Sequence, residues 1–390
     1  MKTNIYLDNG ATTMVDPEVV KAMQPFFTET YGNASSIHHM GQAAKQALNE
    51  ARETVAKRLN AGYDEVIFTS GGTESDNLAI LGTAFAKKKD GNHIITTRIE
   101  HPAVQNTCRF LETQGFEVTY LDVDSEGFID PEKLEAAITD KTILVTIIHG
   151  NNEIGTIQDL EAIGEVCRKH KVLFHTDAVQ SFTKVPINTK KLNIDLISMS
   201  SHKIHGPKGV GALYVRKGVR LQPVTHGGGH EFKLRPGTEN ISGIVGFARA
   251  VRLSSDSDVK RIARLRDYFI SRVEDEIPNT QLNGPRGDKR LCNNINISFA
   301  SIEGEALGSY LDIEGICTST GSACSSHSLE PSHVLTSIGL SKELANGTLR
   351  MTLSRFTTEK DIDFTVDMLK KYTEKLRKIS PLSRVLKKVI

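Results

Sequence analysis

Short runs of apolar and β-branched residues recur through the first half of the chain, and longer amphipathic stretches separate most of them. Such runs are typical of buried strands, whereas apolar residues at helical spacing indicate helices. Alternation of the two predicts an α/β fold with a mostly parallel sheet covered on both faces. The predicted strands are Val66–Thr69, His93–Thr97, Val118–Leu121, Ile143–His149, Val172–Thr176, Leu196–Met199 and Gly211–Val215, and the predicted helices include Gln42–Leu59, Ala103–Gln114 and Leu160–His170.

The pattern changes after Asn240. A long helical stretch with a polar break at residues 254–257 runs to about Ile277, short strands follow at Asn294–Phe299 and Thr348–Leu353, and a helix over Glu359–Lys378 comes last. A chain of 390 residues exceeds one small core. We therefore predict a large domain over residues 15–255 and a smaller α+β domain formed by residues 1–14 and 256–390.

Composition restricts the cellular setting. The formal net charge is +1, so no global field favours nucleic acid or a membrane surface as a partner. No apolar run reaches membrane-spanning length, and the first residues lack the apolar core of a signal peptide. The five cysteines are odd in number and scattered, with no Cys-x-x-Cys pair and no Cys/His cluster. We expect a cytoplasmic protein, since a reducing compartment fits unpaired thiols.

Cys324 is the most informative single residue. It lies within Thr320–Ser326, a run of Gly, Ala and hydroxyl side chains that leaves little bulk around the sulfur. Core thiols normally lie among Leu, Val and Ile instead. The segment alone fits a reacting thiol and an incidental cysteine in a surface loop equally well, because reactivity depends on thiolate character and access.

The predicted strand Leu196–Met199 runs into Ser200, His202 and Lys203. A lysine at the end of a buried strand is costly unless it is paired or used chemically. A lysine amine forms a Schiff base with an aldehyde cofactor, and desolvation would favour the reactive neutral amine. The plainer alternative is a solvated lysine in a turn.

A second predicted strand, Val172–Thr176, delivers Asp177 near its carboxyl end, and Gln180 follows three residues later. Open α/β sheets bind ligands at that edge. A carboxylate there can hold a pyridine nitrogen protonated, as a pyridoxal cofactor requires. The alternative is an aspartate that caps the following turn.

The segment after Val66–Thr69 is a candidate phosphate site. Gly71, Gly72 and Thr73 precede an apolar helix over Leu78–Ala86, so backbone N–H groups and a hydroxyl gather at a helix N-terminus, where an anion is favoured. The segment is neither a Walker loop nor a Gly-x-Gly-x-x-Gly fingerprint, and an ordinary helix cap explains it nearly as well.

Taken together, these segments resemble the pyridoxal-phosphate-dependent cysteine desulfurases of the class V aminotransferase-like, fold-type I group. The resemblance runs through the whole chain and implies a large domain with a mostly parallel seven-stranded sheet. The stretch after Cys324 resembles the corresponding segment in one subgroup of the family, which has a long active-cysteine loop and supplies sulfur for iron–sulfur clusters. The motifs are Tyr6–Thr13, Tyr31–His38, Thr69–Asn77, Glu100–Val104, Asn151–Gly155, Asp177–Gln180, Ser201–Lys203, His226–Glu231, Arg235–Asn240, Gly321–Ser326 and Ser328–Leu335.

The resemblance implies roles for the candidate residues. Lys203 is implied to hold pyridoxal 5'-phosphate as a Schiff base, with Asp177 paired to the ring nitrogen. His101 is implied to stack on the ring and to relay protons to the substrate thiol, which suits a side chain that titrates near neutral pH. The other implied cofactor contacts are Gly72, Thr73, Asn152, Gln180, Ser200 and His202.

A homodimer is also implied, because in this family a threonine of the neighbouring subunit completes the phosphate site, and Thr238 matches it. Arg350 matches the arginine that binds the substrate carboxylate, which Asn152 also faces, and its planar fork suits that anion. The alternatives are a helix cap for His101 and a structural ion pair for Arg350. Departures from the family pattern occur at Gly10, Ala34, Phe182 and Thr183.

The implied reaction converts L-cysteine to L-alanine. Lys203 moves a proton from the substrate Cα, Cys324 attacks the substrate sulfur as a thiolate, and a persulfide remains on Cys324. The sulfur then passes to an iron–sulfur scaffold protein or to another acceptor, such as one that serves tRNA thiolation. Cys324 is also a candidate ligand for a transient iron–sulfur cluster. The rival hypotheses are a selenocysteine lyase or other class V aminotransferase and, more distantly, a non-catalytic sulfur carrier or scaffold component.

Overall fold

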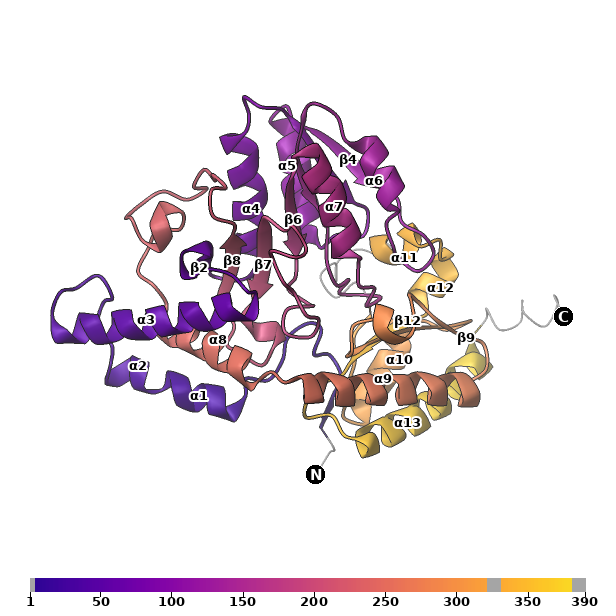
Figure 1. The fold of residues 1–390 in the computed structure, drawn as a ribbon. Coiled ribbons are helices and arrows are strands. Elements are labelled where there is room, and N and C mark those ends of the chain that lie inside the picture. Colours follow the sequence, from indigo (N-terminus) through magenta and orange to yellow (C-terminus); the bar gives the residue numbers. More distant parts are fainter. Residues whose placement is uncertain (1–3, 321–330, 381–390) are drawn as a thin grey trace.

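The computed structural model describes residues 4–320 and 331–380, and its larger part is built on one sheet (Figure 1). Within these residues, seven strands lie in the order β2-β8-β7-β6-β5-β3-β4. This confirms the predicted α/β fold with a seven-stranded, mostly parallel sheet. The strand bounds are β2 Val66–Thr69, β3 His93–Thr97, β4 Glu117–Leu121, β5 Thr142–Thr146, β6 Leu173–Asp177, β7 Leu196–Ser200 and β8 Gly211–Val215.

Strand β8 differs from the others in direction. It pairs antiparallel with both β2 and β7, whereas the pairs among β3, β4, β5, β6 and β7 are parallel. Only residues 201–210 join β7 to β8. A parallel return needs a crossover of about a dozen residues or more, so this short connection produces a hairpin-like reversal.

One predicted strand is shorter than expected. The apolar run Ile143–His149 suggested a strand over its whole length, but β5 ends at Thr146. Beyond that point the amides of Ile147 and His149 still donate to the carbonyls of His175 and Asp177, at 3.1 and 2.9 Å. The chain therefore follows β6 irregularly and continues into the turn that carries Asn152.

Alternate residues of each strand point to opposite faces and enter separate cores. Val66 and Phe68 lie in a core with residues of α1, α3, α6, α7 and α8, whereas Ile67 lies in a second core with residues of α4 and α5. Helices thus cover both faces of the sheet (Figure 1). The helix bounds are α1 Pro17–Met23, α2 Pro25–Thr28, α3 His39–Arg58, α4 Gly72–Ala86, α5 Pro102–Thr113, α6 Pro131–Ala137, α7 Leu160–His170 and α8 Ile241–Leu253.

Two helices begin earlier than the apolar pattern predicts, and in α4 this is because polar residues form the first turn. Helix α4 begins at Gly72 rather than near Leu78, directly after Gly71, whose φ of 153° favours glycine. Helix α3 begins at His39, and His38 caps it by accepting a hydrogen bond from the Gly41 amide at 3.3 Å. The early start of α4 places its N-terminus at the end of the sheet.

A smaller antiparallel sheet, ordered β12-β10-β9, forms the second body of the molecule. Helices α9, α10 and α13 pack on it, and Ile5 and Leu7 lie in the same core. The predicted division into residues 15–255 and residues 1–14 plus 256–390 stays a prediction that this separate core supports. The bounds are β1 Ile5–Tyr6, α9 Asp256–Glu276, β9 Thr280–Leu282, β10 Asn294–Phe299, α10 Gly304–Ile313, β11 Ile316–Cys317, β12 Thr348–Thr352 and α13 Glu359–Ile379.

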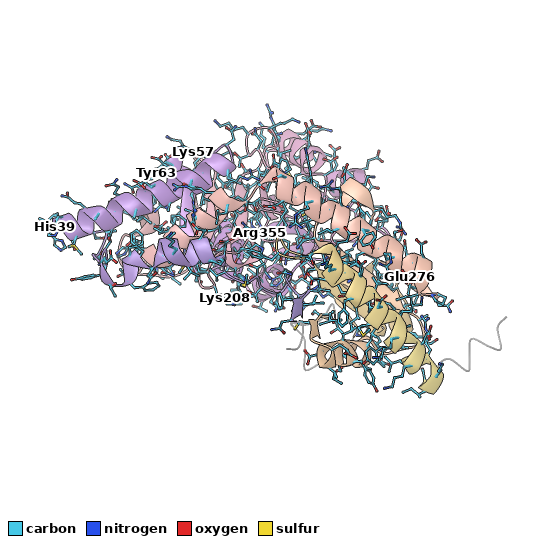
Figure 2. The ribbon with its side chains drawn as sticks, turned by 90° about the horizontal axis from the view of Figure 1, so that it is seen from below. His39, Lys57, Tyr63, Lys208, Glu276 and Arg355 are labelled. Carbon is cyan, nitrogen blue, oxygen red and sulfur yellow. The ribbon has the colours of Figure 1, made fainter. Side chains whose placement is uncertain are left out.

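The two bodies meet along a hydrogen-bonded seam. Seen from below, Arg355 lies between the block that contains α3 and the block in which α9 ends at Glu276 (Figure 2). Its guanidinium donates to the Leu253 carbonyl at 3.3 Å, and the Leu291 amide donates to the Gly155 carbonyl at 2.8 Å. Helices α11 (His333–Ser337) and α12 (Lys342–Asn346) pack against the large body. No helix in the described part of the chain has the length and apolar character to cross a bilayer.

Candidate active site

Lys203 lies at the carboxyl end of the large sheet, in the 3-10 helix η2 (Ser201–Lys203) that follows β7. Its Nζ donates to the carbonyl oxygens of Gly10 and Ala11, at 2.6 and 2.7 Å. The amino-terminal segment therefore crosses the end of the sheet beside this lysine. The Thr13 hydroxyl fixes that segment by donating to the His202 carbonyl at 2.9 Å.

Asp177 is the last residue of β6 and pairs in register with Ser198 of β7. Its Oδ1 accepts from the Val179 amide at 2.8 Å. Burial raises the pKa of Asp177 to about 6, whereas the Val179 amide and the Lys203 charge lower it. Gln180 Nε2 donates to the Gly10 carbonyl at 2.8 Å, the oxygen that Lys203 also contacts. The structure thus brings Lys203, Asp177 and Gln180 together.

Behind Asp177 lie three buried side chains that the sequence analysis did not single out. His175 Nε2 is 3.0 Å from Ser198 Oγ and 3.7 Å from Asp76 Oδ1. Burial lowers the pKa of His175 to about 3, so its ring is neutral. Burial, reinforced by the Asp177 charge, raises the pKa of Asp76, and burial raises the pKa of Glu100 to about 8. The sequence did offer signals for them, because Asp76 and Glu100 lie within the motifs Thr69–Asn77 and Glu100–Val104, and His175 is a polar residue inside an apolar strand.

The predicted phosphate residues line one cavity of about 400 Å³. Gly72 and Thr73 form the N-terminus of α4 there, where backbone amides favour an anion. The hydroxyl oxygen of Ser200 is buried and has no hydrogen-bond partner among the described residues. A Cβ at position 72 would approach Val179 Cγ2 to 2.6 Å, so any other residue would force Val179 or the backbone to shift at this close contact. The lining residues are Ala11, Thr12, Ser70, Gly71, Gly72, Thr73, Glu74, Ser200, His202, Lys208 and Gly209.

This donor set fits a phosphate group. Ser200 supplies a hydroxyl that lacks a partner, and the helix N-terminus supplies amides. His202 Nδ1 is 3.1 Å from Thr12 Oγ1, and burial with the nearby Lys203 charge lowers the pKa of His202 to about 4. A neutral imidazole so placed can donate one hydrogen bond without adding charge.

His101 caps α5 and accepts from the Ala103 amide through Nδ1 at 3.1 Å. A ring nitrogen that accepts is unprotonated, so the neutral ring carries its proton on Nε2. Burial, together with the Lys203 and His333 charges, lowers the pKa of His101 to about 4. His101 and Thr73 also line a cavity of about 390 Å³, and Thr73 is shared with the phosphate cavity. The helix-cap role that was an alternative is present, and it leaves Nε2 available.

Arg350 lies in β12 and is 4% exposed. Its Nη2 pairs with Asp8 Oδ1 at 3.0 Å, and Nη1 donates to the Asn152 carbonyl at 3.1 Å. The buried Nε of Arg350 and Oδ1 of Asn152 have no hydrogen-bond partner among the described residues. The ion pair that was the alternative therefore exists, yet the guanidinium and the amide both retain unused hydrogen-bonding capacity.

One departure from the family pattern has a local explanation. A Cβ at Gly10 would lie 3.1 Å from Thr352 Cγ2 and 3.6 Å from Arg350 Cζ. The Gly10 amide donates to Thr352 Oγ1 at 2.7 Å, so the two segments are already in close contact. An alanine at this position would require Thr352 to shift, and glycine avoids that shift.

Two predicted site residues are not placed in the site of this chain. Thr238 is exposed and does not line the phosphate cavity. Cys324 lies within residues 321–330, outside the described residues. The chain before that segment is attached at Ser319, whose amide and carbonyl bond to the Arg350 backbone at 3.1 and 2.6 Å. This attachment lies beside the predicted carboxylate site.

The chain after that segment is attached to the large body instead. Ser332 Oγ accepts from the Val334 and Leu335 amides, and its hydroxyl donates to Glu153 Oε2 at 2.5 Å. His333 Nε2 donates to the Glu100 carbonyl at 2.9 Å. Burial raises the pKa of Glu153 to about 7. Glu153 is thus a further buried acid near the site that the sequence analysis missed.

Within residues 4–320 and 331–380, no group of His, Cys, Asp and Glu side chains is arranged to hold a metal ion. The four described cysteines, at positions 108, 167, 292 and 317, are free thiols. Burial raises the pKa of each of these thiols, which disfavours the reactive thiolate.

Comparison with known proteins gives matches along nearly the whole chain. The chain is 52% identical over 384 residues to "Cysteine desulfurase IscS" of Dictyoglomus turgidum, which covers 98% of this chain and 97% of that protein. The protein of the same name from Vibrio vulnificus is 50% identical over 390 residues, covering 98% and 96%.

Solved structures agree with these relatives. A "NifS-like protein" has a TM-score of 0.89 at 38% identity, covering 96% of this chain and 100% of that one. A structure described as "SspA in complex with cysteine" has a TM-score of 0.82 at 40% identity, covering 91% and 100%. The family model described as aminotransferase class-V matches residues 5–364. The end-to-end similarity and the shared fold lead to one conclusion: this chain belongs to the aminotransferase class-V family.

Proposed function

We propose that this protein is a pyridoxal-phosphate-dependent cysteine desulfurase. The observation that carries the proposal is the convergence of Lys203, Asp177 and Gln180 at adjacent strand ends, next to an anion-binding helix N-terminus. The cofactor-binding residues are Lys203, Asp177, Gln180, His101 and Asn152 around the ring, with Gly72, Thr73, Ser200 and His202 around the phosphate. Relatives named cysteine desulfurase support L-cysteine as the substrate.

When bound, the cofactor supplies an electron sink that stabilises negative charge at the substrate Cα. Asp177, with a pKa of about 6, is mostly ionised at pH 7 and can keep the pyridine nitrogen protonated. Lys203 moves the Cα proton through Nζ. Arg350 binds the substrate carboxylate with its unused Nε, and Asn152 orients the substrate.

Sulfur transfer then uses the chain's own thiol. His101, neutral at pH 7, holds or moves a proton at the substrate thiol through Nε2. The Cys324 thiolate attacks the substrate sulfur, so an S–S bond forms as the substrate C–S bond breaks. The electron pair of that C–S bond stays with the carbon fragment, which takes up a proton and leaves as alanine. The Cys324 persulfide donates sulfur to an acceptor, for which we propose an iron–sulfur scaffold protein in the cytoplasm.

The direct test is to incubate the cofactor-loaded protein with L-cysteine and to measure alanine, and sulfide in the presence of a reductant. Lys203→Ala is expected to abolish both products. Cys324→Ser is expected to abolish alanine formation while visible cofactor absorbance is retained. Full alanine production by Cys324→Ser from cysteine would refute the persulfide mechanism, and turnover of selenocysteine alone would favour a selenocysteine lyase.

A homodimer is part of the proposal. Phe27, Tyr31 and Ile37 are 62%, 69% and 91% exposed, and they cluster in one stretch of the chain near α2 and the start of α3. Large exposed apolar side chains so close in sequence are expected to be covered by another protein surface. Thr238 is exposed as well, as a residue that serves the neighbouring subunit must be.

Complementation tests the shared site. Mixed dimers of Lys203→Ala and Thr238→Ala subunits contain one site in which both residues are native, so activity is expected to return on mixing. Two inactive variants that stay inactive in a verified mixed dimer would contradict a contribution of Thr238 across the interface.

A further inference from the structure

Lys184 contacts two backbone segments of the candidate site, and the proposed mechanism leaves it without a role. Its Nζ donates to the Gln180 carbonyl at 2.8 Å and to the Lys203 carbonyl at 3.2 Å. These carbonyls belong to two turns, one after β6 and one after β7. The described residues provide Lys184 with no carboxylate within ion-pair distance, so backbone oxygens hold its charge.

The chain conformation before Lys184 directs the side chain to this position. Thr183 has φ 67°, in the left-handed region, which is a true outlier for a β-branched residue. Its carbonyl accepts from Arg58 Nη2 at 3.1 Å, and the Lys184 amide donates to the Ser181 carbonyl at 2.9 Å. The surrounding contacts therefore maintain an unfavourable backbone conformation. Such conformations persist where they serve a constraint beyond local packing.

Gln180 and Lys203 are linked in a second way, through side chains. Gln180 Nε2 and Lys203 Nζ both donate to the Gly10 carbonyl, at 2.8 and 2.6 Å. Cofactor binding uses the Lys203 Nζ, so this link changes when the protein is loaded. The Lys184 contacts involve only main-chain oxygens of Gln180 and Lys203, so they do not depend on the state of the Lys203 amine.

We propose that Lys184 is a positioning residue that holds the Lys203 backbone at a set distance from the Gln180 turn in the cofactor-loaded protein. The inference rests on the proposed function. Burial lowers the pKa of Lys184 to about 8, so the ammonium form prevails at pH 7 and its three donors can serve two carbonyls together. A neutral side chain of similar length would fill the space but leave both oxygens without this donor.

The test compares Lys184→Met, which keeps length, with Lys184→Arg, which keeps charge and several donors. Lys191→Met is the matched control, since Lys191 is exposed and pairs with Glu161 on the surface. Each protein is prepared without cofactor and mixed with pyridoxal 5'-phosphate. Borohydride then traps the bound cofactor, and peptide mapping gives the labelled fraction at position 203. Cofactor release is followed by loss of visible absorbance.

We expect Lys184→Met to release cofactor about tenfold faster, because hydrogen bonds from a charged donor are lost. Lys184→Arg is expected to restore retention to near the wild-type value, and Lys191→Met to leave it unchanged. Thermal unfolding without cofactor, run on every protein, separates positioning from folding. Lys184→Gln, which keeps one amide donor, replaces Lys184→Met if the latter does not fold.

The inference is overturned if Lys184→Met retains cofactor as wild type does. It is also overturned if the substitution lowers the stability of the cofactor-free protein as much as that of the loaded protein. Lack of rescue by Lys184→Arg in a folded protein would also overturn it. A wild-type protein that takes up no label at Lys203 would instead refute the proposed function, so the two failures are distinguishable.

Discussion

Removal of Arg52 is expected to be among the most destabilising single substitutions in this protein. Arg52, on α3, and Glu231 form an ion pair with side chains only 3% and 1% exposed. Both guanidinium Nη atoms are engaged, with Nη2 2.6 Å from Glu231 Oε1 and Nη1 2.7 Å from Oε2. Nη1 also donates to the Val66 carbonyl at 2.5 Å. The pair thus joins α3, β2 and the segment that precedes Thr238.

The magnitude follows from what Arg52→Ala leaves behind. The Glu231 carboxylate would stay buried with the Phe68 amide, 2.7 Å from Oε2, as its remaining described donor. Breaking a buried pair from one side costs about 3–5 kcal/mol, because an uncompensated charge remains. Cation–π contacts to Phe68 and Phe232, at 4.9 and 5.1 Å from the ring centres, are lost as well.

The local backbone makes the pair still more important. Glu231, Phe232 and Lys233 have φ values of 41°, 56° and 66°, so three consecutive residues adopt left-handed conformations. Each such residue costs about 1–2 kcal/mol in an L-amino acid chain. Without the ion pair to Arg52, fewer contacts stabilise this turn, so the segment is expected to rearrange.

The assay is urea unfolding of Arg52→Ala against Lys57→Ala. Lys57 lies on the same helix (Figure 2), but its pair with Glu53 is exposed, at 79% and 55%. Loss of that pair should change stability by no more than about 0.5 kcal/mol. In the double-mutant cycle, Glu231→Ala should lower the free energy of unfolding much less in the Arg52→Ala background than in the wild-type protein. A loss below about 1 kcal/mol for Arg52→Ala would refute the assignment of a strongly coupled buried pair.

Three further outcomes are expected. Gly155→Ala should lower the free energy of unfolding by at least about 2 kcal/mol, since φ is 78° and a Cβ there would lie 2.8 Å from Asn294 Oδ1. Gly218→Ala, at φ 92° but with open space around the Cβ, should lower it by about 1 kcal/mol in the same unfolding assay. Because burial raises the pKa of Glu100 to about 8, the folded state binds the extra proton, and stability should fall as pH rises from about 4.5 to 8, by at most about 1.4 kcal/mol per pH unit. Glu100→Gln should reduce that slope, to which the raised pKa values of Asp177 and Glu153 also contribute, and an unchanged slope would contradict a buried neutral acid at position 100. Ser332→Ala and Ser341→Ala each remove a helix cap worth about 1 kcal/mol. Only Ser332→Ala also removes a hydrogen bond to the Glu153 carboxylate, so only this variant should slow alanine formation. Equal rates in both variants would argue against a positioning role for that contact.

Local pattern was enough to predict most elements of the large sheet. Helix α7 was predicted at its observed bounds from its apolar residues, which recur at helical spacing. The structure adds that Asp159 caps its first turn. The direction of β8 was not predicted. The short connection before β8 could have indicated this direction, since a parallel return needs more chain than residues 201–210 provide.

The sequence by itself determined the chemistry that is available. Strand ends placed Lys203 and Asp177 at one edge of a sheet, and a helix start placed Gly72 and Thr73 near the same edge. These are local consequences of strand and helix patterns, so they could be read before any tertiary contact was known.

Only the tertiary structure decided which groups surround that chemistry. The Gly10 carbonyl between Gln180 and Lys203, the Asp8 partner of Arg350 and the Arg52–Glu231 pair join residues separated by 170 to 342 positions. No periodicity links such distant residues, because their contacts arise when two bodies and an amino-terminal strand pack together. Burial then sets the pKa values of His101, Asp177 and Glu100, since the cost of desolvating a charge depends on the whole surrounding fold.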